Sequence, residues 1–259
     1  MSFCEPAEVV RTTRLTPSMI RVRLRTVGGW RWYDDGGGDE RVDLAFPRPG
    51  EEHADVAFFN DREYGHSRQG EEPPWRHYTV RAVHGGGAEL DIDFVLHDGG
   101  LASGWAATVQ PGARIGVFHG GASRSYYAPP ADAAWQLLVA DATGLPGLAR
   151  IVEELPAGAV AHAVVEVPEE SDRQEIATRG SVSWTWITGS GGLRSALPEA
   201  VARLELPAGA GYGWVACEAA AARRLRRHLR EVRGLARDRH RAVGYWTAGT
   251  AGHVEQDRD

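Results

Sequence analysis

Residues 75–83, WRHYTVRAV, place two arginines, a tyrosine and a threonine in an alternating strand pattern. Acidic residues and prolines (71–74) precede it and a glycine run (85–87) follows it, as expected for a strand between turns. Alternate side chains of a strand share a face, so Arg76, Tyr78 and Val80 are expected to point the same way. A phenol can lie against a flat ring system, and an arginine fork can bind a phosphate. A flavin nucleotide needs both groups; an edge strand with a half-buried tyrosine is the alternative interpretation.

The rest of the first half has the patterns of short antiparallel strands. Residues 19–27 alternate apolar side chains with arginines, and residues 89–96 alternate them with aspartates, so each predicts a strand with one buried and one wet face. Further strands are predicted at 42–46 and 113–118, while 34–40 and 65–74 are expected to be surface loops. Strands at this spacing predict a small closed barrel.

The second half has a different pattern, in which buried strands alternate with helices. Strands are predicted at 136–140, 161–167, 182–187 and 213–217, and helices at 146–155, within 193–204 and at 218–232. The last helix is expected to bury Leu225, Leu229 and Val232, with five arginines on a solvated face. This alternation predicts a parallel α/β sheet, and the domain boundary is placed near residues 128–134.

Composition narrows the class of protein. The 259 residues carry a net charge of −6, which argues against nucleic acid as a partner. Cys4 and Cys217 are too few and too far apart for a disulfide framework or a metal site. No apolar run approaches the ~20 residues of a membrane span, and the first residues lack the pattern of a signal peptide. We therefore expect a cytoplasmic protein without a membrane partner.

A second motif follows the first by about twenty residues, at 95–112 (VLHDGGLASGWAATVQPG). Gly99 and Gly100 relax the backbone before a short helix that opens at Ala102 and Ser103. Backbone N–H groups at a helix start, with no bulky side chains nearby, suit a pyrophosphate. A pyrophosphate implies FAD rather than FMN, and a glycine turn capped by Ser103 is the alternative.

In this order, the motifs resemble those of siderophore-interacting proteins, a branch of the ferredoxin–NADP⁺ reductase superfamily. The R-x-Y-T-x-R strand of that family is matched by Arg76, Tyr78, Thr79 and Arg81. Its H-G-x-x-G-P-A-S-x-W-A segment is matched by His97, Gly100, Ala102, Ser103, Trp105 and Ala106, with Leu101 in place of proline. Its later motifs are matched by Asp141, Thr143, Leu145, Pro146, Glu218, Tyr245, Trp246 and Gly249. The resemblance covers about residues 8–249.

The resemblance implies a six-stranded antiparallel FAD-binding β-barrel over residues 1–130 and an α/β NAD(P)H-binding-like domain over 131–259, with FAD in the cleft between them. Such proteins take electrons from NADH, NADPH or a ferredoxin and pass them singly to ferric iron in a siderophore. The residues assigned to the cofactor are Arg76, Tyr78, Thr79, His97, Gly100, Leu101, Ala102, Ser103, Asp141 and Thr143. No metal site is implied, and the catalytic residues stay unassigned.

The chain departs from the family where a substrate is expected. Where the family has a lysine, this chain has Asp43, and where the family has an arginine it has Thr247. Of three expected cations, only Arg124 remains. The expected substrate residues are Asp43, Arg124, Trp246 and Thr247. Ferric-siderophore or ferric-chelate reduction is the first functional hypothesis. The alternative is an FAD-binding biosynthetic enzyme, a tailoring oxidoreductase or a cyclase, acting on a neutral or cationic organic molecule; a binding protein without turnover is a third.

The nicotinamide side also departs from the family. Ala142 replaces a glutamate, and Thr188 stands where an arginine can bind a cofactor phosphate, although Arg194 lies slightly later in a glycine loop. These changes predict slow or absent reduction of the flavin by NADH and NADPH.

Overall fold

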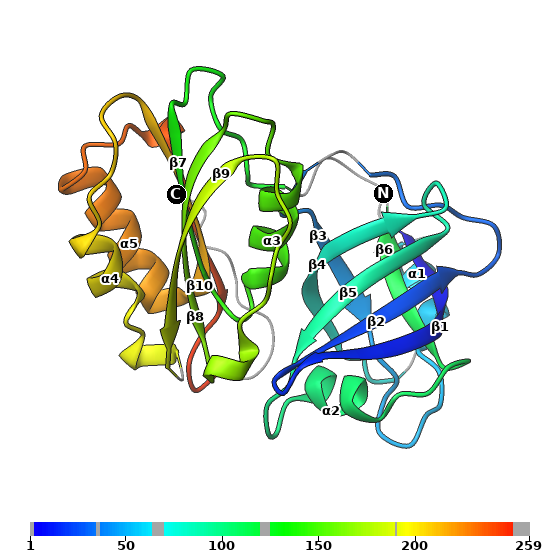
Figure 1. Ribbon diagram of the computed structural model, residues 1–259. Coiled ribbons are helices and arrows are strands. Elements are labelled where there is room, and N and C mark those ends of the chain that lie inside the picture. The colour runs from blue at the N-terminus through cyan, green and yellow to red at the C-terminus, as the bar shows by residue number, and fades with distance from the viewer. Residues whose placement is uncertain (1–2, 35–36, 64–69, 120–124, 190, 251–259) are drawn as a thin grey trace. The chain divides into compact units, whose positions relative to one another are not determined.

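The chain consists of two compact units, Met1–Ser125 and Tyr126–Asp259. A computed structural model describes residues 3–34, 37–63, 70–119, 125–189 and 191–250 (Figure 1). Each unit is described by itself, and the domain ranges 1–130 and 131–259 stay a prediction. In the described part of the chain, no helix is long and apolar enough to cross a membrane.

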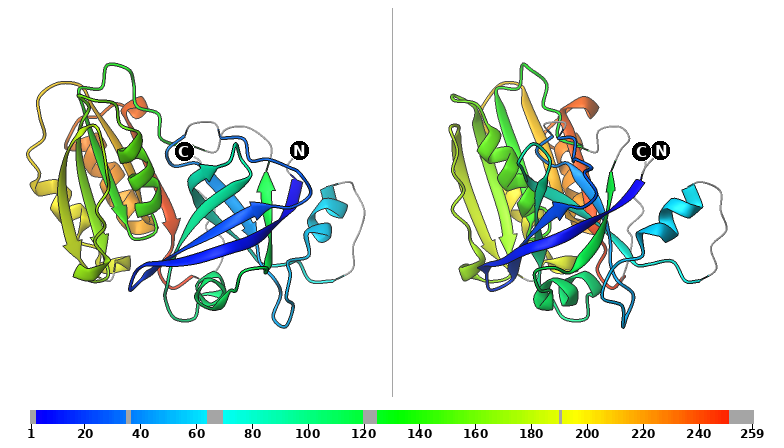
Figure 2. Two further views of the ribbon diagram at one scale, coloured as in Figure 1. Left: turned by 45° about the vertical axis from the view of Figure 1, so that its right-hand side comes forward. Right: turned by 90° about the vertical axis from the view of Figure 1, so that its right-hand side faces the viewer.

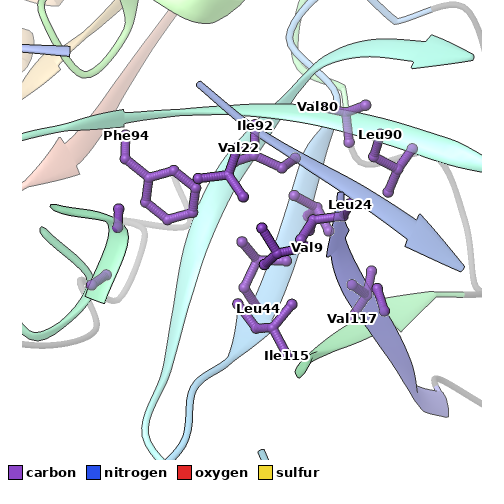
Figure 3. Packing of buried hydrophobic residues seen from close by; sticks show 14 of the residues in the cluster. Val9, Val22, Leu24, Leu44, Val80, Leu90, Ile92, Phe94, Ile115 and Val117 are labelled. Atoms are coloured by element: carbon purple, nitrogen blue, oxygen red, sulfur yellow. The ribbon is translucent and has the colours of Figure 1, made fainter. Parts of the chain in front are cut away.

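The first unit is a closed antiparallel barrel of six strands, which confirms the predicted fold. The strands are β1 (Phe3–Thr16), β2 (Met19–Thr26), β3 (Arg41–Ala45), β4 (Trp75–His84), β5 (Glu89–Val95) and β6 (Arg114–His119). They pair in the order β1-β2-β5-β4-β3-β6. Two helices accompany them, α1 (Val56–Glu63) and α2 (Leu101–Thr108). The barrel is filled by alternate side chains of all six strands, among them Val9, Val22, Leu44, Val80, Ile92 and Ile115 (Figure 3).

Strand β1 and helix α1 were not expected from the sequence. The pairing of β1 with β2 shifts register twice, so β1 lacks the clean alternation of its neighbours. Helix α1 is held by the Asn60 side chain, whose Oδ1 accepts a hydrogen bond from Cys4 N (2.9 Å) and whose Nδ2 donates to Cys4 O (2.8 Å). Because a single polar side chain makes this contact with the backbone of β1, the helix sequence shows no periodic apolar pattern.

The loop expected at the surface over residues 34–40 is partly buried, so that expectation was wrong at its end. Asp39 and Glu40 are 1% and 4% exposed. Glu40 Oε2 accepts a hydrogen bond from the indole N–H of buried Trp32 (3.1 Å). Of the other expected loop, 65–74, residues 65–69 lie outside the described residues, and residues 70–72 are exposed as expected.

The outer face of β2 and β5 carries a ladder of cross-strand ion pairs. Arg21 faces Asp93, Arg23 faces Asp91 and Arg25 faces Glu89. Arg21 Nε lies 2.6 Å from Asp93 Oδ1, and Arg23 Nη2 lies 2.7 Å from Asp91 Oδ2. The two aspartate side chains are only 1% and 3% exposed, so the expected wet face was wrong at these positions. Long arginine side chains on the facing strand cover the short carboxylates.

This ladder predicts acid sensitivity of the barrel. Burial acts to raise the pKa of Asp91, but hydrogen bonds from Arg23 and His84 outweigh it and hold that pKa below its ordinary value. The Asp91 carboxylate therefore stabilises the fold above the unfolded pKa of about 3.9, and the contribution is lost as pH falls through the lower folded pKa. We expect Asp91→Asn to flatten the decline in unfolding free energy below pH ~4, measured by urea unfolding. Asp98→Asn, at an exposed position, is the control; equal acid profiles for Asp91→Asn and the parent would contradict the prediction.

The second unit is a parallel α/β sheet, as predicted. Its strands are β7 (Trp135–Asp141), β8 (Val160–Val167), β9 (Ser181–Thr188), β10 (Gly211–Glu218) and β11 (His240–Trp246), in the order β11-β10-β7-β8-β9. Helices α4 (Leu197–Arg203) and α5 (Ala219–Glu231) cover one face and α3 (Leu145–Glu154) lies on the other (Figures 1 and 2). Short 3₁₀ turns occupy Glu170–Asp172, Gly192–Arg194 and Arg237–Arg239.

Two details of this unit differ from expectation. Leu225 and Leu229 are buried as predicted, but Val232 is 70% exposed because α5 ends before it. Strand β11 was not expected: it is an edge strand in which His240 and Ala242 are buried, so its sequence carries little apolar pattern.

Both cysteine thiols are buried, one in each unit. Cys4 lies in β1 against Gly116 of β6, where a Cβ atom would come within 2.7 Å of the sulfur. Cys217 lies near the end of β10. Burial raises the pKa of both thiols, and neighbouring carboxylates raise it further.

Candidate functional site

Strand β4 places Tyr78 at the edge of the barrel core. The ring centroid of Tyr78 lies 4.4 Å from that of Phe94 and 6.4 Å from that of Phe46. Burial raises the pKa of the Tyr78 hydroxyl, and the nearby Arg76 offsets this only in part. The phenol therefore stays protonated at neutral pH and can donate a hydrogen bond.

Helix α2 reaches the same aromatic residues through Trp105. The Trp105 ring centroid lies 5.3 Å from that of Phe46 and 5.6 Å from that of Phe94. Phe46, Tyr78, Phe94 and Trp105 thus form one aromatic cluster, which connects Tyr78 of β4 to Trp105 of α2 through the two phenylalanines. One residue from each of the two motifs predicted to bind FAD therefore packs in the same aromatic cluster.

The start of α2 is shaped by two glycines. Gly99 has a positive φ of 76°, and a Cβ at Gly100 would come within 2.3 Å of the His97 ring. Gly100 is the N-cap and has no side chain with which to cap the helix. The Ser103 hydroxyl accepts from His97 N and donates to His97 O, both at 2.8 Å. It therefore closes the turn.

The other predicted cofactor residues differ in what they offer. Ala102 and Ser103 are buried and Leu101 packs against the core, so these three can offer a ligand only backbone groups. Arg76 is half-buried and its Nη1 donates to Trp75 O at 2.7 Å. Thr79 is buried and pairs across strands with Arg41, on the barrel face opposite Tyr78.

These residues fit FAD. The start of α2 has no side-chain cap, and its backbone N–H groups suit a pyrophosphate; the His97 ring packs so close to Gly100 that no side chain fits at that position. Arg76 supplies a fixed positive charge, and Tyr78 supplies a protonated phenol on the aromatic cluster.

The expected substrate residue Asp43 already has partners. Its Oδ1 makes a short hydrogen bond with His77 Nδ1 and lies 3.6 Å from Arg41 Nε. The acidic charge at this position is therefore shared with an imidazole and a guanidinium. Arg124 lies outside the described residues.

In the second unit, Asp141 lies at the carboxyl end of β7 and is 5% exposed. Its Oδ1 accepts from Thr143 N (2.9 Å) and Thr143 Oγ1 (2.5 Å), and its Oδ2 accepts from Glu218 N (2.9 Å) and the Trp246 indole N–H (2.7 Å). Burial raises the pKa of Asp141, and these hydrogen bonds oppose that rise. The carboxylate therefore joins the ends of β7, β10 and β11.

Trp246 and Thr247 were expected at the substrate, and Asp141 and Thr143 at the cofactor. The structure brings Asp141, Thr143 and Trp246 together through the carboxylate. Thr247 follows in the next turn, where its carbonyl accepts from Thr250 N at 3.1 Å. Their roles toward a ligand stay predictions.

Arg41 and His77 lie beside Asp43 but were not among the site residues predicted from the sequence. Arg41 precedes Asp43 by two residues, so the alternation of β3 already puts both on one face. The pairing of β3 with β4 that brings His77 to Asp43 is not visible in a single sequence.

A closed six-stranded antiparallel barrel followed by a parallel α/β unit is the ferredoxin reductase-like fold. Residues 8–123 match the siderophore-interacting FAD-binding domain, and residues 133–249 match the siderophore-interacting protein family. The chain belongs to the siderophore-interacting protein family.

Named relatives and solved structures are similar over most of the chain. The NADPH-dependent ferric-chelate reductase of Escherichia coli is 33% identical over 70% of this chain and 69% of its own. The ferric vibriobactin reductase of Vibrio cholerae is 30% identical over 70% of each chain. A siderophore utilization protein from T. fusca has a TM-score of 0.81 at 33% identity, covering 98% of this chain and 96% of its own.

Proposed function

We propose that this protein is an FAD-dependent reductase of a ferric siderophore or related ferric chelate. The observation that carries the proposal is the aromatic cluster. It connects β4, which carries Arg76 and Tyr78, to α2, whose start has no side-chain cap. Both named relatives are reductases of ferric complexes, which supports the same activity here.

The residues of the barrel have distinct roles in this proposal. Arg76 binds a phosphate of FAD through its guanidinium fork, and the N–H groups at the start of α2 bind the pyrophosphate. The protonated hydroxyl of Tyr78 is available to donate a hydrogen bond to the bound FAD. When bound, FAD supplies the conversion between two-electron and one-electron transfer that iron reduction needs. Ferrous iron is held less well than ferric iron by hard oxygen ligands, so reduction releases the metal.

The electron donor and the substrate residues are part of the proposal. NADPH is the donor named for the Escherichia coli relative, and NADH or a ferredoxin are the other donors the resemblance implies. Thr188 is exposed at the end of β9 and Ala142 is half-buried after β7, so neither adds a charge for a nicotinamide cofactor. Asp43, Arg124, Trp246 and Thr247 remain the proposed substrate residues, and the cytoplasm the proposed location.

The alternative of a neutral organic substrate rested on the loss of positive charge at Asp43 and Thr247. The partners of Asp43 weaken that argument, because Arg41 lies 3.6 Å from its carboxylate and His77 is hydrogen-bonded to it. No described contact favours a neutral ligand.

The proposed function is tested without an external donor. We expect the purified protein to carry non-covalent FAD and, after photoreduction without oxygen, to transfer electrons to a ferric chelate. Stopped-flow absorbance follows flavin reoxidation, while a ferrous-specific chelator reports the iron released. Addition of the same chelate loaded with gallium, which has the charge of ferric iron but is not reduced, is the control. Protein that fails to bind added FAD, or reduced flavin that ferric chelates leave unchanged, would contradict the proposal.

A further inference from the structure

The outer face of β3 carries a cation beside the expected substrate residue. Val42 and Leu44 are fully buried in the barrel, so Arg41 and Asp43 lie on the opposite, outer side of the same strand. Across the β3–β4 pair, Arg41 faces Thr79 and Asp43 faces His77. The cation therefore lies directly opposite a predicted cofactor residue.

Arg41 has an ion-pair partner in Asp43, but within the described residues its Nε–H donor is not hydrogen-bonded. The nearest carboxylate oxygen, Asp43 Oδ1, is 3.6 Å away, beyond hydrogen-bond length. Arginine stays charged at all physiological pH values, so a buried donor without an acceptor is costly. The Arg41 side chain as a whole is 28% exposed, although its Nε is buried.

Asp43 does not cancel this charge alone, because its carboxylate is shared. The same Oδ1 makes the short hydrogen bond with His77 Nδ1 and is the atom nearest to Arg41. The contacts at this point thus join Arg41 and Asp43 of β3 with His77 of β4. A lysine that the family places at position 43 is absent, and a cation stands two residues earlier on the same face.

We propose that Arg41 is a specificity-determining residue that contacts an anionic oxygen of the ferric chelate, in place of the cation missing at position 43. This inference rests on the proposed function. Because Asp43 remains beside it, the site favours chelates with a small negative charge over strongly anionic ones. The predicted substrate class is therefore an oxygen-donor ferric chelate close to monoanionic, rather than a trianionic tris-catecholate.

The test measures chelate affinity in the oxidised holoprotein, with no turnover. Flavin fluorescence is titrated with monoanionic ferric EDTA and with trianionic ferric tris-catecholate at low salt. We expect the parent to bind ferric EDTA more tightly than ferric tris-catecholate. Arg41→Gln should bind ferric EDTA about tenfold more weakly than the parent does, equivalent to ~1.4 kcal/mol. Arg41→Lys should recover part of the affinity, because it keeps the charge without the fork. Asp43→Asn should bind the tris-catecholate several-fold more tightly.

Arg25→Gln is the matched control, because Arg25 is also an arginine on the outer barrel face with a carboxylate partner. It removes the same net charge and should leave chelate affinity unchanged. Equal affinities for Arg41→Gln and parent, with FAD content and thermal unfolding intact, would overturn the inference. Loss of FAD from Arg41→Gln would also overturn it, because the residue would then belong to the cofactor site. Parent protein whose reduced flavin no ferric chelate reoxidises would instead overturn the proposed function.

Discussion

Replacing Arg76 by alanine is expected to leave the purified protein nearly colourless. Arg76 is the only arginine on the same strand face as Tyr78, and its guanidinium would bind a phosphate of FAD. A hydrogen bond to a charged group is worth about 1.5–3 kcal/mol, so FAD affinity should fall roughly 10- to 100-fold. The visible flavin spectrum and the FAD released on denaturation measure the effect.

The control separates phosphate binding from folding. Within the described residues, Arg76 Nη1 donates to the neighbouring Trp75 carbonyl and to no other group, so the barrel should unfold at nearly the parent temperature. Arg76→Lys keeps the charge without the planar fork and should retain an intermediate amount of FAD. A yellow Arg76→Ala protein with parental FAD affinity would remove Arg76 from the site.

The second large effect is expected in the α/β unit. Asp141→Ala removes the carboxylate that accepts from Thr143, Glu218 and Trp246, and leaves these buried or half-buried donors without acceptors. Breaking a buried polar network in this way typically costs about 3–5 kcal/mol. We expect urea unfolding to show a loss of this size.

Asp141→Asn is the informative companion variant. It keeps one oxygen acceptor but places an amide NH₂ among N–H and O–H donors, so the loss should be smaller than for alanine. Thr143→Val removes one hydroxyl donor only and should cost the least. If Asp141→Ala unfolds like the parent but loses affinity for a nicotinamide nucleotide, the carboxylate serves the cofactor, as the resemblance implied, and not the fold.

The sequence predicted elements well wherever a regular pattern coincides with burial. The strand at 19–27 was found because its apolar residues alternate with arginines, and the strand at 136–140 because it is a short continuous apolar run. Strand β11 and helix α1 were missed because neighbours hold them through the backbone or a single polar side chain, as Asn60 does. Asp91 and Asp93 were placed in water because their burial depends on arginines of another strand.

The candidate site shows the same limit. Arg76 and Tyr78 were identified because a motif and a strand period both point to them. Arg41 and His77 become candidate site residues only through the pairing of β3 with β4. Arg41 then faces Thr79 and His77 faces Asp43, and a single sequence does not reveal this register. Shared use of the Asp43 carboxylate could not be inferred from a charge count.

The two buried thiols insulate the protein from the chemistry proposed for it. A reduced flavin in air yields peroxide, and the thiolate is the form of cysteine that peroxide and alkylating reagents attack. Cys4 and Cys217 are both 0% exposed, and burial keeps them in the thiol form. Each becomes reactive only when its own surroundings open: the β1–β6 seam for Cys4, and the end of β10 for Cys217. Each unit therefore contains one cysteine whose alkylation requires local opening. The alkylation rates of Cys4 and Cys217 would measure local opening of the barrel and of the sheet separately.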